Sequence, residues 1–150
     1  MKRIFVVIIC AIVLCGNSLS VAATEPSDSI RQKTVIDNRI VIVDEISVFS
    51  HARSSEKSAE RKRSIYDGDT LIAVIAFQAT FRYDGVSASV VSKILTQEDT
   101  YSGWSFKQSS FTSSGNTVTL EGKLKYLLIL KSENIVMSVS CDKNGNITYS

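Results

Sequence analysis

Histidine chemistry in this protein would depend on His51, the only histidine in the sequence. His51 lies among small and charged residues that supply no fixed partners, whereas a catalytic triad or a metal cluster needs partners in defined geometry. Two pairs of carboxylates could act as acid and base: Asp67 with Asp69, and Glu98 with Asp99. Both pairs coincide with expected turns, where Asp is common for conformational reasons. The sequence therefore predicts no catalytic residue, and we expect a protein that is not an enzyme.

Residues 142–147 (DKNGNI) carry oxygen-bearing side chains at alternate positions, as the start of a calcium-binding loop does. That loop requires glycine at its sixth position, where this sequence has Ile147. Asn144 and Gly145 stand between two alternating apolar runs, which is typical of a hairpin turn over residues 143–146. We expect a turn here, and the sequence predicts neither a metal site nor a cofactor site.

The aromatic residues of 101–106 are the candidate ligand contact. Tyr101, Trp104 and Phe106 lie close together in the sequence and could form an exposed platform for a glycan or a protein segment. In a small sandwich such a cluster packs more often in the core of the domain, and we favour that interpretation. The exposure of Trp104 distinguishes the two interpretations, because a buried indole offers little surface to a ligand.

The longest strand expected from the sequence covers Thr70–Tyr83. Alternate positions from Leu71 to Tyr83 are apolar, and a period of two is typical of a strand. Asp-Gly dipeptides at 67–68 and 84–85 bound this strand as turns. Because both of its faces begin apolar, we expect the strand to be central and nearly buried at its start and to reach solvent near Arg82.

The chain after this strand continues as alternating segments separated by turn residues. The run 86–95 changes phase between Val90 and Val91, which predicts a β-bulge. In the run 135–141, Cys141 shares the apolar face, so we expect a buried thiol with a raised pKa. The alternative for Cys141 is an intermolecular disulfide. About seven strands with regular turn signals predict an all-β fold, an antiparallel β-sandwich over residues 64–150.

Residues 24–63 differ in composition from the rest of the chain. The apolar run at 40–43 fits a strand or a buried helical turn, and its length does not decide between them. Ser50–Ser64 is rich in Ser, Lys, Arg and Glu and has almost no large apolar residue to offset the entropy lost on ordering. We therefore expect a flexible N-terminal arm and charged linker over 24–63, in which Arg61–Arg63 would be an exposed target for trypsin-like proteases.

Residues 1–23 have the layout of a secretory signal peptide: Lys2 and Arg3, an apolar run at 4–14, and small residues ending at Ala23. The apolar run is about half of the roughly 20 residues that a membrane-spanning helix needs, so we expect cleavage and no stable membrane insertion. This leader holds two of the 17 basic residues and none of the 15 acidic ones, so 15 of each remain. Zero net charge gives no electrostatic reason to expect a nucleic acid partner.

Four segments carry a resemblance: ATFRYDG at 79–85, YSGW at 101–104, SSGNTVTLEGKL at 113–124 and SVSCDKNGNI at 138–147. Their order over residues 65–150 resembles that in uncharacterised small secreted proteins of Gram-positive bacteria. The shared patterns are turns and strands, so the resemblance implies an exported bacterial protein and no catalytic residue.

Together these observations predict a secreted, non-enzymatic β-sandwich protein, located outside the cell or at the cell surface. Its expected role is that of an interaction module, with an unknown protein or glycan as partner. The alternative is a small exported bacteriocin-like or toxin-like protein that is processed near Arg61–Arg63.

Overall fold

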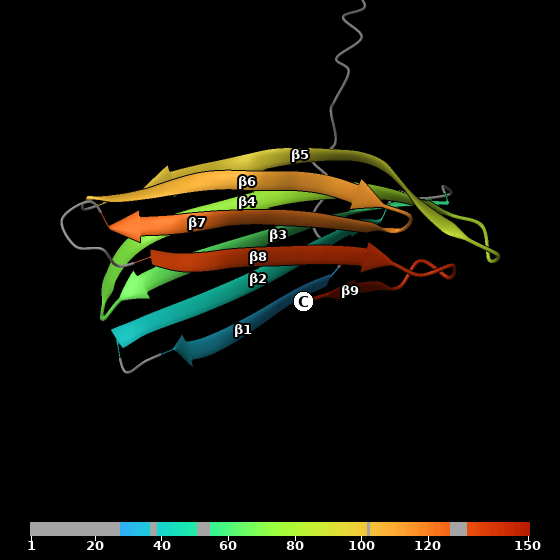
Figure 1. Ribbon diagram of the computed structural model, residues 1–150. Helices are drawn as coiled ribbons and strands as arrows, with labels where there is room; N and C mark the ends of the chain where they lie inside the picture. Colours follow the sequence, from blue (N-terminus) through green and yellow to red (C-terminus); the bar gives the residue numbers. More distant parts are fainter. Residues whose placement is uncertain (1–27, 37–38, 51–54, 102, 127–131) are drawn as a thin grey trace, which may run out of the picture.

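The computed structural model describes residues 28–36, 39–50, 55–101, 103–126 and 132–150. The expected signal peptide (1–23) and His51 lie outside these residues. Nine strands occupy almost all of the described chain (Figure 1): β1 (Asp28–Ile36), β2 (Ile40–Ser50), β3 (Glu56–Asp67), β4 (Thr70–Tyr83), β5 (Ala88–Thr100), β6 (Trp104–Ser114), β7 (Thr117–Tyr126), β8 (Ser132–Cys141) and β9 (Ile147–Tyr149).

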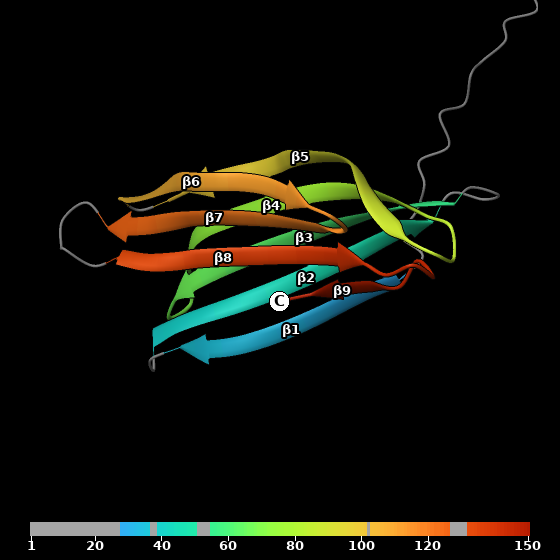
Figure 2. The same cartoon turned by 45° about the vertical axis from the view of Figure 1, so that its right-hand side comes forward.

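The strands form two sheets that pack face to face. The larger sheet has the order β1-β2-β3-β4-β5 and the smaller one the order β6-β7-β8-β9, with antiparallel pairing throughout. Figures 1 and 2 show the two layers, which are joined at one side where β5 leads into β6. The predicted antiparallel β-sandwich is confirmed, with nine strands in place of about seven.

Strand β4 has the bounds expected from its alternation and turn signals. It pairs with β3 on one side and β5 on the other, and its first half is buried on both faces. Arg82, near its end, is exposed. Opposite β4, the register jumps from Ser92 to Val90, so Val91 is the extra residue of a bulge, where the change of phase predicted one.

The interior between the sheets is closely packed. Its largest apolar side chains come from alternate positions of the facing strands, such as Phe77 and Phe81 of β4 and Leu120 and Met137 of β7 and β8. Cys141 is fully buried among them, as its position in the alternation predicted. The interior therefore follows the period of two that the sequence shows.

The prediction of a flexible arm and charged linker over 24–63 is wrong for the described part of that range. Residues 28–36, 40–50 and 56–67 form β1, β2 and β3, which are three of the five strands in the larger sheet. The composition of this segment suggested a linker because β3 carries charged residues on both of its faces. Ala59 and Ile65 face the core on one side of that strand, and Arg61 lies between them.

The same strand removes the expected protease site. The 61–63 segment is paired with β2 on one side and β4 on the other, and the Arg61 side chain is 2% exposed. A protease needs an accessible, extendable segment. The expected exposed cleavage target is therefore not present in the folded chain.

Candidate functional site: the open edge of the sandwich

The three aromatic residues expected to contact a ligand do not form a shared exposed platform. Trp104 is 7% exposed and packs on Tyr126, with ring centroids 5.1 Å apart. Phe106 is half-buried, with its ring over Gly122, while Tyr101 is exposed at the end of β5. The structure thus places Trp104 in the core, which was the favoured interpretation of the cluster.

The acidic pairs are explained by local structure. Asp67 is the last residue of β3 and Asp69 lies in the β3–β4 turn, and Asp67 accepts a hydrogen bond from Arg39 at 2.9 Å. The turn expected at Glu98 and Asp99 is wrong, because both residues lie on β5, where their backbones pair with β4. Within the described ranges, no three His, Cys, Asp or Glu side chains are grouped as metal ligands would be.

Asp142 closes the turn between β8 and β9. One carboxylate oxygen accepts hydrogen bonds from the backbone N–H of Asn144 and Asn146, and the other accepts one from the Asn146 side chain. These bonds favour the charged carboxylate and lower the pKa of Asp142. The 142–146 segment forms the turn between β8 and β9, where the Asn-Gly dipeptide predicted a hairpin turn.

A buried charged cluster of Asp44, Arg61 and Arg63 was not expected from the sequence. Arg63 donates two hydrogen bonds of 2.8 Å to the Asp44 carboxylate, and the Arg61 guanidinium lies 3.5 Å from the same group. Burial lowers the pKa of Arg61, while the Asp44 charge opposes that shift. The Asp44 carboxylate thus forms ion pairs with two guanidiniums between the sheets.

These two arginines also bridge the sheets. Arg61 donates to the backbone oxygen of Ser138 at 2.9 Å and to that of Ser150, and Arg63 donates to the backbone oxygen of Val136 at 3.1 Å. Ser138 and Val136 belong to β8, and their oxygens point toward the side on which β9 pairs. The arginines from β3 therefore occupy acceptors along the edge of β8, where the short β9 ends.

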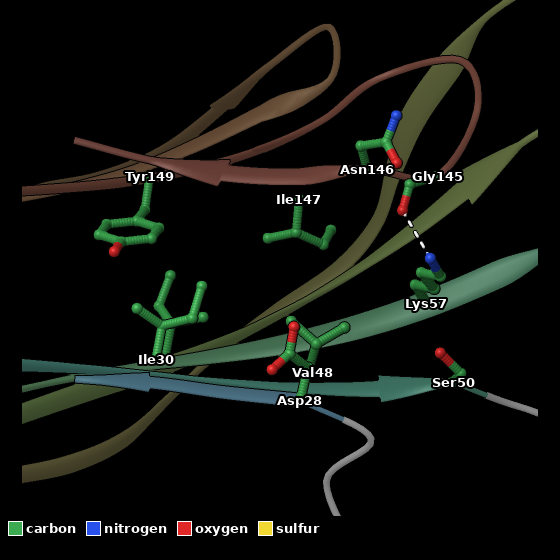
Figure 3. A pocket seen from close by; sticks show the side chains of 10 residues that line it. Asp28, Ile30, Val48, Ser50, Lys57, Gly145, Asn146, Ile147 and Tyr149 are labelled. Carbon is green, nitrogen blue, oxygen red and sulfur yellow. Dashed lines mark hydrogen bonds between the residues drawn. The ribbon is translucent and has the colours of Figure 1, made fainter.

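A groove opens next to this cluster, at the side of the sandwich where β9 faces β1 and β2. It has a volume of about 270 Å³. Figure 3 shows Ile147 and Tyr149 of β9 on one wall, and Asp28, Ile30 and Val48 of β1 and β2 on the other. Ile30 is 47% exposed although it lies on the inner face of its strand. The groove is thus a portion of the inner face that no described residue covers.

The groove exists because the edge strand of the smaller sheet is much shorter than the edge strand β1 of the larger sheet. The larger sheet has five full strands, whereas the smaller one ends with β9, a strand of 3 residues. Figures 1 and 2 show β9 beside the start of β1, and β2 and β1 running on past the end of β9. No described strand lies opposite β1 beyond β9, so part of the inner face of β1 meets solvent.

Two charged groups lie at the groove, in different circumstances. The Lys57 ammonium donates a hydrogen bond of 2.8 Å to the backbone oxygen of Gly145, seen as the dashed line in Figure 3. The Asp28 carboxylate lies beside Val48, and no described residue forms an ion pair with it. At one end the Tyr149 ring stacks on Arg61, 5.6 Å from its guanidinium carbon. Of the two charged groups, the Asp28 carboxylate is therefore the one that a ligand in the groove could pair with.

The free edge of β9 borders the groove. Ser150 and Ser138 exchange both of their backbone hydrogen bonds, so in the antiparallel ladder Ile147 and Tyr149 direct their N–H and C=O groups away from β8. No backbone partner for these four groups is found among the described residues. A strand edge in this state is a template for pairing with another chain.

No family model, curated protein or solved structure matches this chain. In the part of the chain that the structure describes, no helix has the length and apolarity of a membrane span. The geometry of the groove is thus the main guide to function. Sequence reasoning missed the groove because residues 28–36 were not assigned to a strand. With that assignment, the unequal lengths of β1 and β9 would have been a signal for it.

Proposed function

We propose that this protein is an exported, non-enzymatic interaction module that binds an extended polypeptide segment in the groove between β9 and the β1–β2 pair. The observation that carries the proposal is the partly exposed Ile30, an inner-face residue facing Ile147 and Tyr149 across an open space. Protein segments that add to a sheet edge gain affinity from backbone hydrogen bonds and specificity from pockets for alternate side chains.

The walls favour a polypeptide over a glycan. Four aliphatic side chains form a strip along the groove, Ile30, Ile46, Val48 and Ile147, among polar residues. Tyr149 is the one aromatic residue of the lining, and its ring is already stacked on Arg61. A glycan needs convergent hydrogen-bonding groups and open aromatic faces, whereas an aliphatic strip suits alternate side chains of a strand. The expected partner is therefore a protein.

Selection of linear peptides tests this proposal. A displayed library of random linear peptides is selected on the immobilised protein, and enriched peptides are then measured against two variants, Ile30→Lys and Val35→Lys. Val35 is the matched control because it lies on the same strand, faces the other side of the sheet and is 60% exposed. We expect Ile30→Lys to abolish binding and Val35→Lys to leave it unchanged.

Two outcomes contradict the proposal. Either no peptide is enriched, or the enriched peptides bind Ile30→Lys as well as the wild type. A glycan array run with the same three proteins identifies the other class of partner, if a glycan binds and Ile30→Lys alone loses it.

Export rests on residues 1–23 and has its own test. The chain is expressed in a Gram-positive host, and the N-terminus of protein recovered from the medium is sequenced. We expect the mature protein to begin at Thr24, after Ala23. Recovery of the protein only inside the cell with residues 1–23 intact contradicts export.

A further inference from the structure

We infer that the partner segment adds to β9 as a fifth strand of the smaller sheet and carries a lysine or arginine that pairs with Asp28. This inference rests on the proposed function and specifies its partner. Strands in one sheet lie about 4.8 Å apart and packed sheets about 10 Å apart. A strand beside β9 would therefore lie over β1 and give the smaller sheet the strand that it lacks opposite β1.

The backbone of β9 supplies the first element of recognition. Ile147 and Tyr149 direct their N–H and C=O groups toward the groove side, two residues apart, which is the spacing at which one strand hydrogen-bonds its neighbour. The corresponding edge of β8 is less available, because Arg63 and Arg61 occupy the oxygens of Val136 and Ser138. Among the described residues, the edge of β9 is thus open, whereas the edge of β8 beside it is covered.

The inner face of β1 supplies the second element. Asp28 and Ile30 are two residues apart and point to the same side, so their side chains are separated by about 6.6 Å along the strand. Inward side chains of an added strand have the same spacing. One of them would rest on Ile30 and the next would lie over Asp28.

Charge then selects the second side chain. The Asp28 carboxylate has no ion-pair partner among the described residues, and Lys57 already donates to Gly145. A basic side chain over Asp28 would gain a partner there, and an acidic one would meet a like charge. The recognised pattern is therefore an apolar residue and a basic residue two positions apart.

The probe is a capped, fluorescein-labelled peptide of about seven residues, in which threonines alternate with isoleucine, lysine and isoleucine at inward positions. A second peptide has glutamate in place of the lysine. Both are titrated by fluorescence anisotropy against the wild type, Asp28→Lys and the control Asp69→Lys, which changes an exposed turn residue away from the groove. We expect the lysine peptide to lose about tenfold in affinity for Asp28→Lys only, and the glutamate peptide to gain affinity for that variant.

Strand addition has a separate readout. In hydrogen exchange, the amides of Ile147 and Tyr149 become slower to exchange when the lysine peptide binds. A version of the peptide with N-methyl groups on alternate residues, placed toward β9, binds more weakly than one methylated on the other set. Equal binding of both methylated peptides, or unchanged exchange at β9, overturns the strand addition.

The outcomes separate this inference from the proposed function. Peptide binding that is lost in Ile30→Lys, but is the same for the lysine and glutamate peptides, overturns the inference and leaves the groove as the binding site. Failure of these probes and of the whole peptide library to bind overturns both.

Discussion

Replacing Asp44 with asparagine removes the carboxylate that Arg61 and Arg63 share. The Asp44 and Arg63 side chains are 13% and 12% exposed, and that of Arg61 is 2% exposed. Removing one partner of a buried ion pair costs about 3–5 kcal/mol, because a buried charge is left uncompensated. Asparagine keeps one acceptor oxygen and the site retains some solvent access, so we expect the lower end, about 3 kcal/mol.

The matched control is Glu45→Gln. Glu45 neighbours Asp44 on β2 and pairs with Arg31 at 3.2 Å, but these side chains are 34% and 67% exposed. Water screens such a pair, and its loss costs about 0–1 kcal/mol. Both variants therefore remove one carboxylate from the same strand, and they differ in burial.

Equilibrium urea unfolding at 25 °C, followed by Trp104 fluorescence and far-ultraviolet circular dichroism, measures the free energy of unfolding. With a urea dependence of about 1.5–2 kcal/mol per molar for a domain of this size, Asp44→Asn should lower the midpoint by about 1.5–2 M. A shift equal to that of Glu45→Gln would refute the argument that burial makes this cluster costly to break.

A triple variant tests the other half of the reasoning. Replacing Asp44 with leucine and both arginines with methionine removes every charge of the cluster together, and a buried ion pair replaced by apolar residues is often neutral or stabilising. We expect the triple variant to be more stable than Asp44→Asn. If it is equally destabilised, desolvation of the charges is not what sets the cost.

Three further expectations follow from packing and burial. Gly122→Ala should lower the free energy of unfolding by about 1–3 kcal/mol in the same urea titration, because its Cβ would clash with the Phe106 ring and lie 2.9 Å from the backbone oxygen of Lys107. A Phe106→Leu background should recover part of this loss. A Gly122→Ala variant as stable as the wild type would contradict the clash. Burial raises the pKa of the Cys141 thiol, so native protein should resist a thiol reagent until urea is added, and rapid labelling of native protein would contradict this. The folded protein should also lose stability as the pH rises beyond about 8.5, the pKa of an unfolded thiol, because the unfolded chain then ionises while the buried thiol stays neutral. Limited trypsin digestion followed by mass spectrometry should show the peptide bonds of 61–63 intact in the folded protein and cut in the unfolded one. If trypsin cuts the native protein there as fast as it cuts an exposed loop, the placement of β3 is contradicted.

Features that depend on neighbouring residues could be predicted from the sequence. The alternation of Thr70–Tyr83 and its flanking Asp-Gly turns gave the bounds of β4, and the change of phase at Val91 located a bulge. The same reasoning located Cys141 in the core and the 142–146 segment in a turn. A strand shows which of its faces is apolar within a few residues, so these assignments need no knowledge of distant segments.

The errors lie where a residue's environment comes from another strand. Arg61 and Arg63 look like solvated charges in β3, because the carboxylate that compensates them is Asp44 on β2 and the oxygens that they bond belong to β8. For Trp104 the sequence left two interpretations, and its contact with Tyr126 of β7 places it in the core. Composition cannot distinguish a charge in water from one that a distant segment satisfies.

By itself the sequence determined an all-β chain, the central strand β4 and the turns that divide the strands, because hydrophobic alternation and turn chemistry are local properties. Tertiary structure alone decided that β1 to β3 belong to the sandwich, and that the smaller sheet ends in a strand of 3 residues opposite a longer one. The groove at Ile30 and Asp28 follows from that mismatch between two sheets. Its physical origin is strand pairing between distant segments, whose partners and lengths no single stretch of sequence specifies.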